Sequence, residues 1–314
     1  MLVGLATVHV AMVAALPPVV VTGATGRVGS AVVRSLIERR GSAENIFVLA
    51  RDVAKANAMH ADVQCLSAAY DDVAALSTAL SSMPAGYRLF LACSNSPTQA
   101  DLESNVCNAA HSSGCEYVVK LSTASAVLEM KEGGPYAAHL RVEELLAQLD
   151  MPHAVLRPNL FMDELVGAFL GVSSLRSSDS CVHPFAESPI SMVDTRDVAE
   201  CAASLLLAAA PDPCAKYDVT GPSAVTLSAD LAGAIKELSG REVTITPCTV
   251  DEYLAPRGLP PPVSASLGGF FSVLMARCTT ATDVVQTLTG RAPRGIGQFV
   301  QDHAADFSAN QQPE

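Results

Sequence analysis

The chain has 314 residues, 49% of them hydrophobic, and its 20 Lys and Arg against 32 Asp and Glu give a net charge of −12. Such an acidic chain is a poor candidate for nucleic-acid binding, in which contacts with phosphates dominate. The nine cysteines stand singly, with no Cys-x-x-Cys pair and no His/Cys cluster at metal spacing. We therefore expect reduced thiols, no metal and a cytoplasmic location.

Charged residues make up only 17% of the chain, which favours a large apolar pocket for a small molecule or an interface in a homodimer. The first stretch, residues 1–17, is almost wholly apolar and ends in proline. It is too short to span a bilayer, which takes about 20 residues, and it lacks the basic start of a signal peptide. We expect an extension that packs on the domain or is disordered, without stable membrane insertion. A targeting role is the alternative.

The stretch from Val19 to Gly41 carries the strongest signal. A β-branched run leads into a glycine-rich turn and then into a helical pattern that ends at Gly41. In the spacing G-x-x-G-x-x-G, Gly23 serves a sharp turn, Gly26 the close approach of a pyrophosphate, and Gly29 tight packing of the helix on the sheet. Backbone N–H groups and the helix dipole meet here. The sequence therefore predicts a nucleotide site that comprises Gly23, Ala24, Thr25, Gly26, Arg27, Val28 and Gly29.

The remaining elements alternate along the chain. Buried-strand patterns occupy residues 46–50, 63–66, 89–92, 117–122 and 154–157, and helical patterns occupy residues 72–80, 99–113 and 136–149. This alternation predicts an α/β fold with a doubly wound parallel sheet. The later part is predicted to contain a serine-rich loop over the site at 173–189, strands at 190–193, 217–222 and 243–246, and helices at 197–209 and 228–239. The rest is predicted to be mostly helical, with a flexible proline stretch at 260–262.

Ligands of parallel sheets bind beyond the carboxyl ends of the strands. Besides the glycine turn, the candidate cofactor contacts at these ends are Arg51, Tyr70, Cys93, Ser94, Asn95, Ser122, Pro158, Asn159 and Phe161. Phe161 offers an apolar wall for a flat acceptor, and the alternative is that it belongs to the core. We interpret Asp163, Asp194 and Asp197 as helix-capping or loop acids.

Several motifs resemble the NmrA-like, atypical short-chain dehydrogenase/reductase family. They are Thr22–Gly29, Leu49–Arg51, Leu156–Met162, Val193–Ala199, Asp218–Pro222 and Leu288–Pro293, and they span nearly the whole chain. Within the family, the chain looks most like NAD(P)H:quinone oxidoreductases and triphenylmethane-dye reductases. The resemblance implies a Rossmann domain of residues 18–160, which also receives parts of 190–222, and a small, discontinuous C-terminal α/β substrate lobe of residues 161–314.

The second strand indicates which coenzyme is bound. An NAD-specific domain carries an acid after this strand, whereas this chain carries Arg51, which suits the 2′-phosphate of NADP(H). Arg27 is a candidate for sharing that task. The alternative is that both arginines are solvated surface residues, and the neighbouring Asp52 keeps NAD(H) open. Where family members often have an acid after the third strand, this chain has Ala69 before Tyr70.

The catalytic residues depart from the family pattern. Short-chain dehydrogenases generally use a Tyr-x-x-x-Lys pair, but Leu140 stands four positions after Tyr136, and no lysine lies nearby in the sequence. His139 matches the position of a histidine in the quinone oxidoreductases, and it lies one turn from Tyr136. An imidazole there can bind the cofactor ribose or donate a proton to the acceptor. We name His139, Tyr136 and Ser122 as catalytic candidates, with helix-surface and strand-capping roles as the alternatives.

Three functions remain open at this point. The favoured one is an NADPH-dependent reductase of a small aromatic, quinone-like or conjugated acceptor, with Phe169, His183, Phe185, Phe270 and Phe271 as candidates for lining the pocket. The second is a catalytically silent, NADP(H)-binding regulatory protein, which the missing Tyr-x-x-x-Lys pair keeps open. The third is an epimerase or dehydratase that holds NAD permanently, which the basic Arg51 disfavours.

Overall fold

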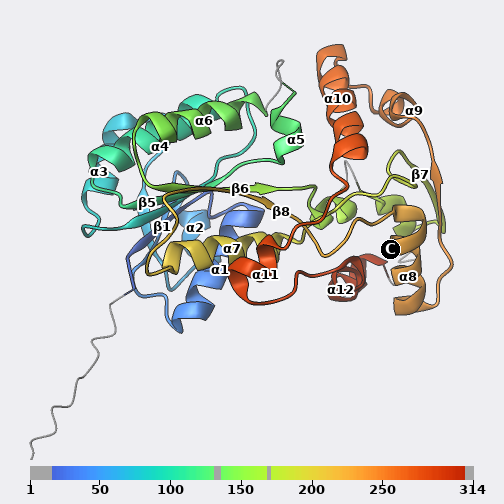
Figure 1. Cartoon of the computed structure of the whole chain (residues 1–314), viewed down its shortest axis with the longest axis horizontal. Coiled ribbons are helices and arrows are strands. Elements are labelled where there is room, and N and C mark those ends of the chain that lie inside the picture. The colour runs from blue at the N-terminus through green and yellow to red at the C-terminus, as the bar shows by residue number, and fades with distance from the viewer. Residues whose placement is uncertain (1–15, 131–135, 168–170, 308–314) are drawn as a thin grey trace, which may run out of the picture.

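The computed structural model describes residues 16–130, 136–167 and 171–307. A seven-stranded parallel sheet in the order β3-β2-β1-β4-β5-β6-β8 forms its centre (Figure 1). The strands are β1 Val19–Thr22, β2 Ile46–Ala50, β3 Gln64–Ser67, β4 Arg88–Leu91, β5 Tyr117–Leu121, β6 His153–Pro158 and β8 Cys214–Val219. The order reverses between β1 and β4, and a crevice for ligands opens at such a point beyond the strand ends.

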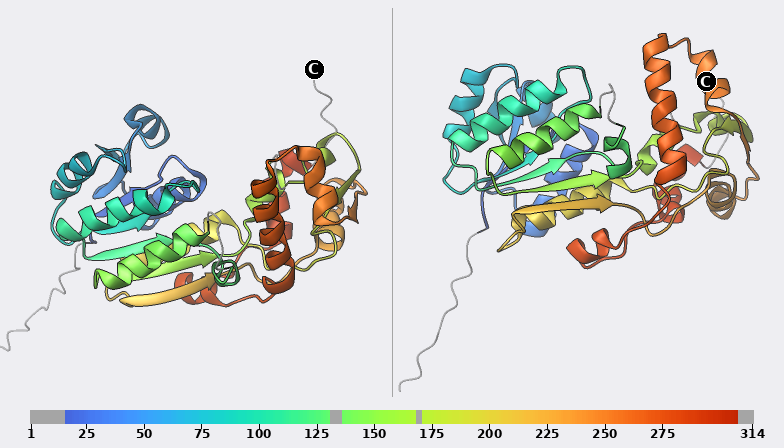
Figure 2. Two further views of the ribbon diagram at one scale, coloured as in Figure 1. Left: turned by 90° about the horizontal axis from the view of Figure 1, so that it is seen from above. Right: turned by 45° about the horizontal axis from the view of Figure 1, so that its top comes forward.

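A second, smaller unit lies beside the carboxyl ends of β5 and β6, as the two views of Figure 2 show. Its two-stranded parallel sheet pairs β7, Ser180–His183, with β9, Thr244–Pro247. Its helices are α5 Ser125–Leu128, η1 Met162–Val166, η2 Ser173–Arg176, η3 Leu227–Leu231, α8 Ala232–Ser239, α9 Val250–Leu254, η4 Ala255–Arg257, α10 Pro261–Arg277, α12 Ile296–Asp302 and α13 Ala304–Phe307. A hydrophobic core of its own, which includes Phe185 and Phe271, holds this unit together.

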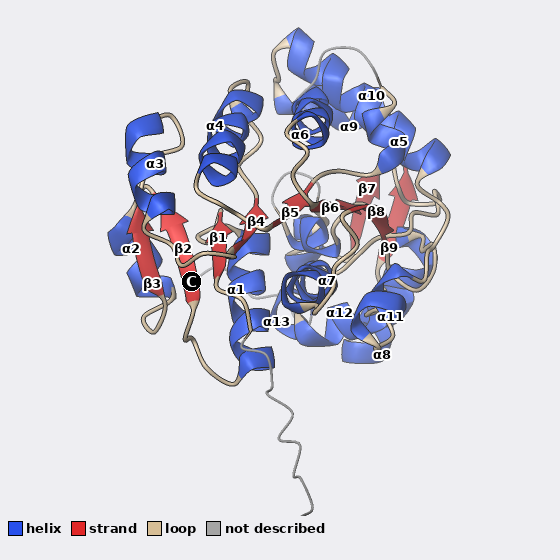
Figure 3. Ribbon diagram, turned by 60° about the vertical axis from the view of Figure 1, so that its left-hand side comes forward, coloured by secondary structure: helices blue, strands red, loops and turns tan. Residues whose placement is uncertain are grey.

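Helices cover both faces of the large sheet, as Figure 3 shows. On one face lie α1, Arg27–Arg40, and α7, Thr195–Leu207; on the other lie α3, Val73–Ser81, α4, Gln99–Ser112, and α6, Ala137–Gln148. Each face has its own buried apolar cluster against the strands. Two shorter helices, α2 at Val53–Met59 and α11 at Val284–Thr289, complete the layers. The predicted doubly wound parallel sheet is thus confirmed.

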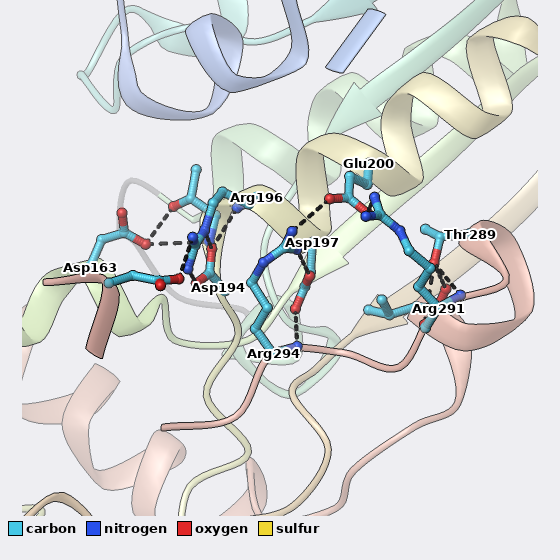
Figure 4. Close-up of polar contacts among 11 residues, drawn as sticks. Asp163, Asp194, Arg196, Asp197, Glu200, Thr289, Arg291 and Arg294 are labelled. Atoms are coloured by element: carbon cyan, nitrogen blue, oxygen red, sulfur yellow. Dashed lines mark hydrogen bonds and ion pairs between the residues drawn. The ribbon is translucent and has the colours of Figure 1, made fainter. Parts of the chain in front are cut away.

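Buried ion pairs join the start of α7 to the end of the chain (Figure 4). The Arg294 guanidinium pairs with the carboxylate of Asp197, and its Nη2 lies 2.9 Å from Oε1 of Glu200. The backbone N–H of Arg294 also donates to Asp197 Oδ2 at 2.7 Å. Asp194 caps α7 by accepting the backbone N–H of Arg196 at 2.8 Å. The three acids predicted to cap helices or lie in loops thus have structural partners: Asp194 caps α7, Asp197 pairs with Arg294, and Asp163 accepts hydrogen bonds from Thr195.

Four details of the sequence prediction are wrong. Residues 190–193 form only isolated bridges, because Ile190 pairs with Val225 and Val193 with Phe161 without building a ladder. The predicted loop at 173–189 contains β7, and its Leu175 and Phe185 belong to the lobe core. The proline stretch at 260–262 starts α10, since prolines in the first turn lose no helical hydrogen bond. Residues 53–59, for which the sequence predicts no element, form α2.

The residues at 1–15 lie outside the described ones, so the structure leaves the predicted extension untested. Among the described helices, none combines the length and the apolar character needed to cross a bilayer. The boundary at residue 160 stays a prediction. Ala124 and Val127 precede it but belong to the lobe core, whereas Val285 follows it and belongs to the core of the large sheet.

Candidate functional site

The glycine turn after β1 has the geometry that its spacing predicts. Gly23 has a φ of +62°, in the left-handed region, and its carbonyl oxygen accepts the N–H of Gly26 at 2.9 Å. A Cβ at Gly29 would lie 2.2 Å from that same oxygen, so only glycine fits there. Gly29 therefore packs against the backbone of the turn rather than against the sheet. The result is bare backbone at the N-terminus of α1, which suits an anionic ligand.

Two side chains from other elements hold this turn in place. The Tyr70 hydroxyl accepts the N–H of Gly23 at 2.9 Å and donates to the carbonyl of Leu49 at 3.3 Å. Burial raises the pKa of Tyr70 to about 12, so the hydroxyl keeps its proton. A ring nitrogen of the buried His60 lies 2.9 Å from the carbonyl oxygen of Ala24. Tyr70 thus supports the turn, and His60 is a contributor that no spacing in the sequence indicates.

The two candidate arginines differ in their surroundings. Arg51 follows β2 and is exposed, and among the described residues it has no hydrogen-bond or ion-pair partner. Arg27 at the start of α1 instead pairs with Glu164 of η1, with Nη1 and Oε1 2.6 Å apart. A phosphate that engaged Arg27 would compete with that carboxylate. At the end of β2, the guanidinium of Arg51 is therefore accessible to an anionic ligand.

A cavity of about 300 Å³ opens where β5 and β6 meet the smaller unit. Of the candidate site residues, those that line it are Cys93, Asn95, Ser122, Tyr136, His139, Pro158, Asn159 and Phe161. Ser94 and the glycine turn do not line it. Glu164, Phe270 and Leu274 add a wall from the C-terminal half of the chain. Strand ends and lobe thus form one site together, which is where a Rossmann fold places its ligands.

The apolar wall of the cavity is a stacked ring pair. Tyr136 before α6 and Phe270 of α10 have their ring centroids 4.7 Å apart and their planes at 20°. Burial, aided by the charge of Glu164, raises the pKa of Tyr136 to about 12, so the hydroxyl is protonated at neutral pH. Of the other aromatic candidates, Phe185 and Phe271 belong to the lobe core, as does the buried His183 beside Phe185. Phe169 lies outside the described residues.

His139 lines the same cavity, is buried, and has a lysine beside it. Lys120 of β5 places its Nζ 3.2 Å from Nδ1 of His139, although 19 residues separate them in the sequence. Burial and the charge of Lys120 lower the pKa of His139 to about 2, so the imidazole is neutral. No lysine is close to His139 in the sequence, but Lys120 is close to it in the folded chain.

Two other candidates have their polar groups engaged within the protein. The Ser122 hydroxyl donates to Oε1 of Glu143 at 2.6 Å, which leaves only its lone pairs for a ligand. The Asn159 amide donates to the carbonyl of Cys278 at 3.1 Å and accepts the N–H of Leu160 at 2.8 Å. The hydrogen of the Ser122 hydroxyl is thus engaged, so Tyr136 and His139 are the catalytic candidates left as donors.

Comparison with known proteins identifies a family for this chain. Residues 23–208 match the NAD(P)H-binding family. The chain is 29% identical over 293 residues, 92% of it and 99% of the relative, to (4-alkanoyl-5-oxo-2,5-dihydrofuran-3-yl)methyl phosphate reductase of Streptomyces griseus. It is 25% identical over 297 residues, 93% of it and 99% of the relative, to the NAD(P)H azoreductase of Xenophilus azovorans.

A solved structure has the same fold. An NADPH-dependent quinone oxidoreductase of Escherichia coli complexed with NADPH superposes with a TM-score of 0.77 at 24% identity, over 91% of this chain and 99% of that one. The chain therefore belongs to the NAD(P)H-binding family, and its predicted place among the NmrA-like, atypical short-chain dehydrogenases/reductases is confirmed.

Proposed function

We propose that this chain is an NADPH-dependent reductase that passes hydride to a small aromatic, quinone-like or otherwise conjugated acceptor. The observation that carries the proposal is the cavity of about 300 Å³, which is lined by the stacked rings of Tyr136 and Phe270 and by the neutral ring of His139. A flat acceptor can lie against such a wall while its oxygen or nitrogen meets a donor. The relatives named as azo and quinone reductases support this acceptor class.

The residues present fit the coenzyme. The turn at Gly23–Gly29 would hold the pyrophosphate, because its backbone lies at the N-terminus of α1, where N–H groups and the helix dipole favour an anion. The exposed Arg51 would meet the 2′-phosphate, and the segment Pro158–Phe161 would border the nicotinamide. When bound, the nicotinamide supplies the hydride, and the chain supplies orientation and a proton donor.

Tyr136 is the proposed proton donor. Its hydroxyl is protonated at neutral pH and lines the cavity, and within the described residues it has no hydrogen-bond partner. His139 is proposed to donate a hydrogen bond from its neutral ring to the acceptor or to the cofactor ribose. Hydride transfer to a conjugated acceptor needs little more than this, because no alcohol has to be deprotonated.

Stopped-flow mixing of the NADPH-loaded protein with a panel of quinones and azo compounds tests the proposal. We expect at least one acceptor to speed the loss of NADPH absorbance. The His139→Ala variant should slow that step about a hundredfold while still binding NADPH, since one aimed donor is lost. His111→Ala, at an exposed position of α4, is the matched control and should behave as the parent does.

The alternative function, a silent NADP(H)-binding regulatory protein, predicts a different result. NADPH would bind, but no acceptor would speed its loss in any variant. That outcome would overturn the reductase proposal. Tightly bound NAD in the purified protein would instead point to the epimerase or dehydratase.

A further inference from the structure

A buried polar cluster lies directly behind the cavity. Lys120 of β5 and Glu103 of α4 both have side chains that are 0% exposed, and Nζ lies 2.9 Å from Oε1 of Glu103. A buried charge survives only where every polar atom has a partner. The surroundings of these two side chains therefore have to be accounted for atom by atom.

The Lys120 ammonium has three hydrogens and three acceptors. They are Oε1 of Glu103, the carbonyl oxygen of Leu121, and Nδ1 of His139 at 3.2 Å. An ammonium only donates. The lone pair of the His139 ring must therefore face Lys120, which places that lone pair on Nδ1.

Gln99 adds a second donor on the same side of the ring. Its side-chain nitrogen lies 3.3 Å from Nδ1 and 3.4 Å from Nε2 of His139, and 3.5 Å from Oε2 of Glu103. Once the lone pair lies on Nδ1, the acceptors within reach of its two hydrogens are Nδ1 and Oε2 of Glu103, while the buried Oε1 of Gln99 has no hydrogen-bond partner among the described residues. Donors from two elements, α4 and β5, converge on one nitrogen of the ring.

We infer that Lys120, held by Glu103, is a positioning residue that fixes His139 in the neutral tautomer with its hydrogen on Nε2. Since the ring lines the cavity and Nδ1 is tied to the interior, Nε2 is the nitrogen left for a ligand. The inference rests on the proposed function for its purpose, because a fixed donor serves an acceptor or ribose oxygen. Lys120 thus lies beside the helix that carries His139, although the Tyr-x-x-x-Lys spacing is absent from this chain.

Nitrogen-15 NMR of histidine-labelled protein tests the tautomer without any coenzyme or turnover. The His139 signals are assigned by their loss in His139→Ala. We expect Nε2 to carry the hydrogen and Nδ1 to be bare. A hydrogen on Nδ1, or on both nitrogens, would overturn the inference. Because no reaction is involved, this result is independent of the stopped-flow outcome, and either can fail alone.

Substitutions then show whether Lys120 is the cause. In Lys120→Met, the His139 signals should shift toward a mixture of the two tautomers, because no ammonium then donates to Nδ1. Lys120→Met leaves Glu103 buried without its partner, so Lys120→Met/Glu103→Leu, which removes both charges, is measured as well. If the single or the double variant keeps the parental pattern, Lys120 does not set the tautomer.

Discussion

At the scale of single residues, charge placement determines what the site can bind. Arg51 and Arg27 both lie near the glycine turn, yet only Arg27 has a carboxylate partner, Glu164 at 2.6 Å. A guanidinium that is already paired must give up that partner before it can bind a phosphate, whereas an exposed one gives up only water. Discrimination between NADPH and NADH is therefore expected to depend on Arg51.

Arg51→Glu is predicted to weaken NADPH binding at least about tenfold more than NADH binding, since it replaces a charge-assisted contact by repulsion. Isothermal titration with each coenzyme measures the two losses. Arg39→Glu makes the same charge change at the far end of α1 and serves as control. Equal losses for the two coenzymes in Arg51→Glu would show that another residue recognises the 2′-phosphate.

Residue positions at strand ends follow from the sequence, but residue partners do not. The alternation of strands and helices is enough to bring Ser122, Asn159 and His139 to one edge of the sheet. Their partners Glu143, Cys278 and Lys120 lie 21, 119 and 19 residues away. No local periodicity predicts contacts between residues so far apart in the sequence. The hydrogen bonds of these three side chains are therefore visible only in the structure.

At the scale of elements, the β1–α1 unit depends on one close backbone contact. Gly29→Ala is predicted to destabilise the protein by about 1–3 kcal/mol, because the new methyl group would have to displace the turn. It should also weaken NADPH binding more than tenfold. Gly233→Ala in α8 meets no atom within 4 Å and is the control. It should be neutral or gain up to about 1 kcal/mol. Urea unfolding measures the stability of both variants, and titration with NADPH measures their coenzyme affinity. Parental stability and affinity in Gly29→Ala would contradict the close contact between Gly29 and the turn.

Helix α6 is joined to the sheet through Glu143. Burial raises the pKa of Glu143, but the hydrogen bonds from Arg157 and Ser122 and the charges of Arg157 and Lys216 outweigh it, so the pKa is lowered overall. A carboxyl group with a lowered pKa adds stability that is fully present above its unfolded value of 4.5 and is lost as pH falls through the folded value.

Glu143→Gln is therefore predicted to cost about 1–3 kcal/mol at pH 7 and to lose less further stability between about pH 5 and about pH 3 than the parent does. The free energy of unfolding in urea, measured for the parent and the variant at pH 7 and at both ends of that pH range, tests both expectations. Glu144→Gln, exposed on the same helix, should follow the parental profile. A parental pH dependence in Glu143→Gln would mean that this carboxylate does not contribute.

The elements that sequence reasoning missed are short or lack periodicity. Helix α2 has only 7 residues, and one of them, Ala56, is buried, so its pattern carries almost no amphipathic signal. Strand β7 has 4 residues within a serine-rich stretch and is specified by pairing with β9, some 60 residues later. The long helices and buried strands, by contrast, have the apolar spacing that makes them recognisable.

At the scale of the whole molecule, Arg294 joins the last part of the chain to α7. Arg294→Met is predicted to cost about 3 kcal/mol, since it leaves the Asp197 carboxylate, 1% exposed, buried without a cation. Arg291→Met removes a guanidinium that is 55% exposed from Glu200 and should cost at most about 1 kcal/mol. Thermal unfolding of both variants, with Arg294→Met/Asp197→Leu as the compensated pair, measures the difference. If Arg294→Met and Arg291→Met lost the same stability, burial of the Asp197 carboxylate would not explain the contribution of Arg294.

The interleaving of the two units has a consequence for synthesis. Strand β8 pairs with β6, and α7 packs on α1, so the coenzyme half lacks its last strand and a covering helix until residue 219 has been made. A nascent chain that extends only to residue 160 lacks β8 and α7. Its sheet therefore has an open edge at β6 and an apolar face without its covering helix, and both features favour aggregation. The nucleotide-binding fold can therefore be completed only after β8 has been synthesised, and we expect the nascent chain to bind chaperones most strongly between residues 160 and 219.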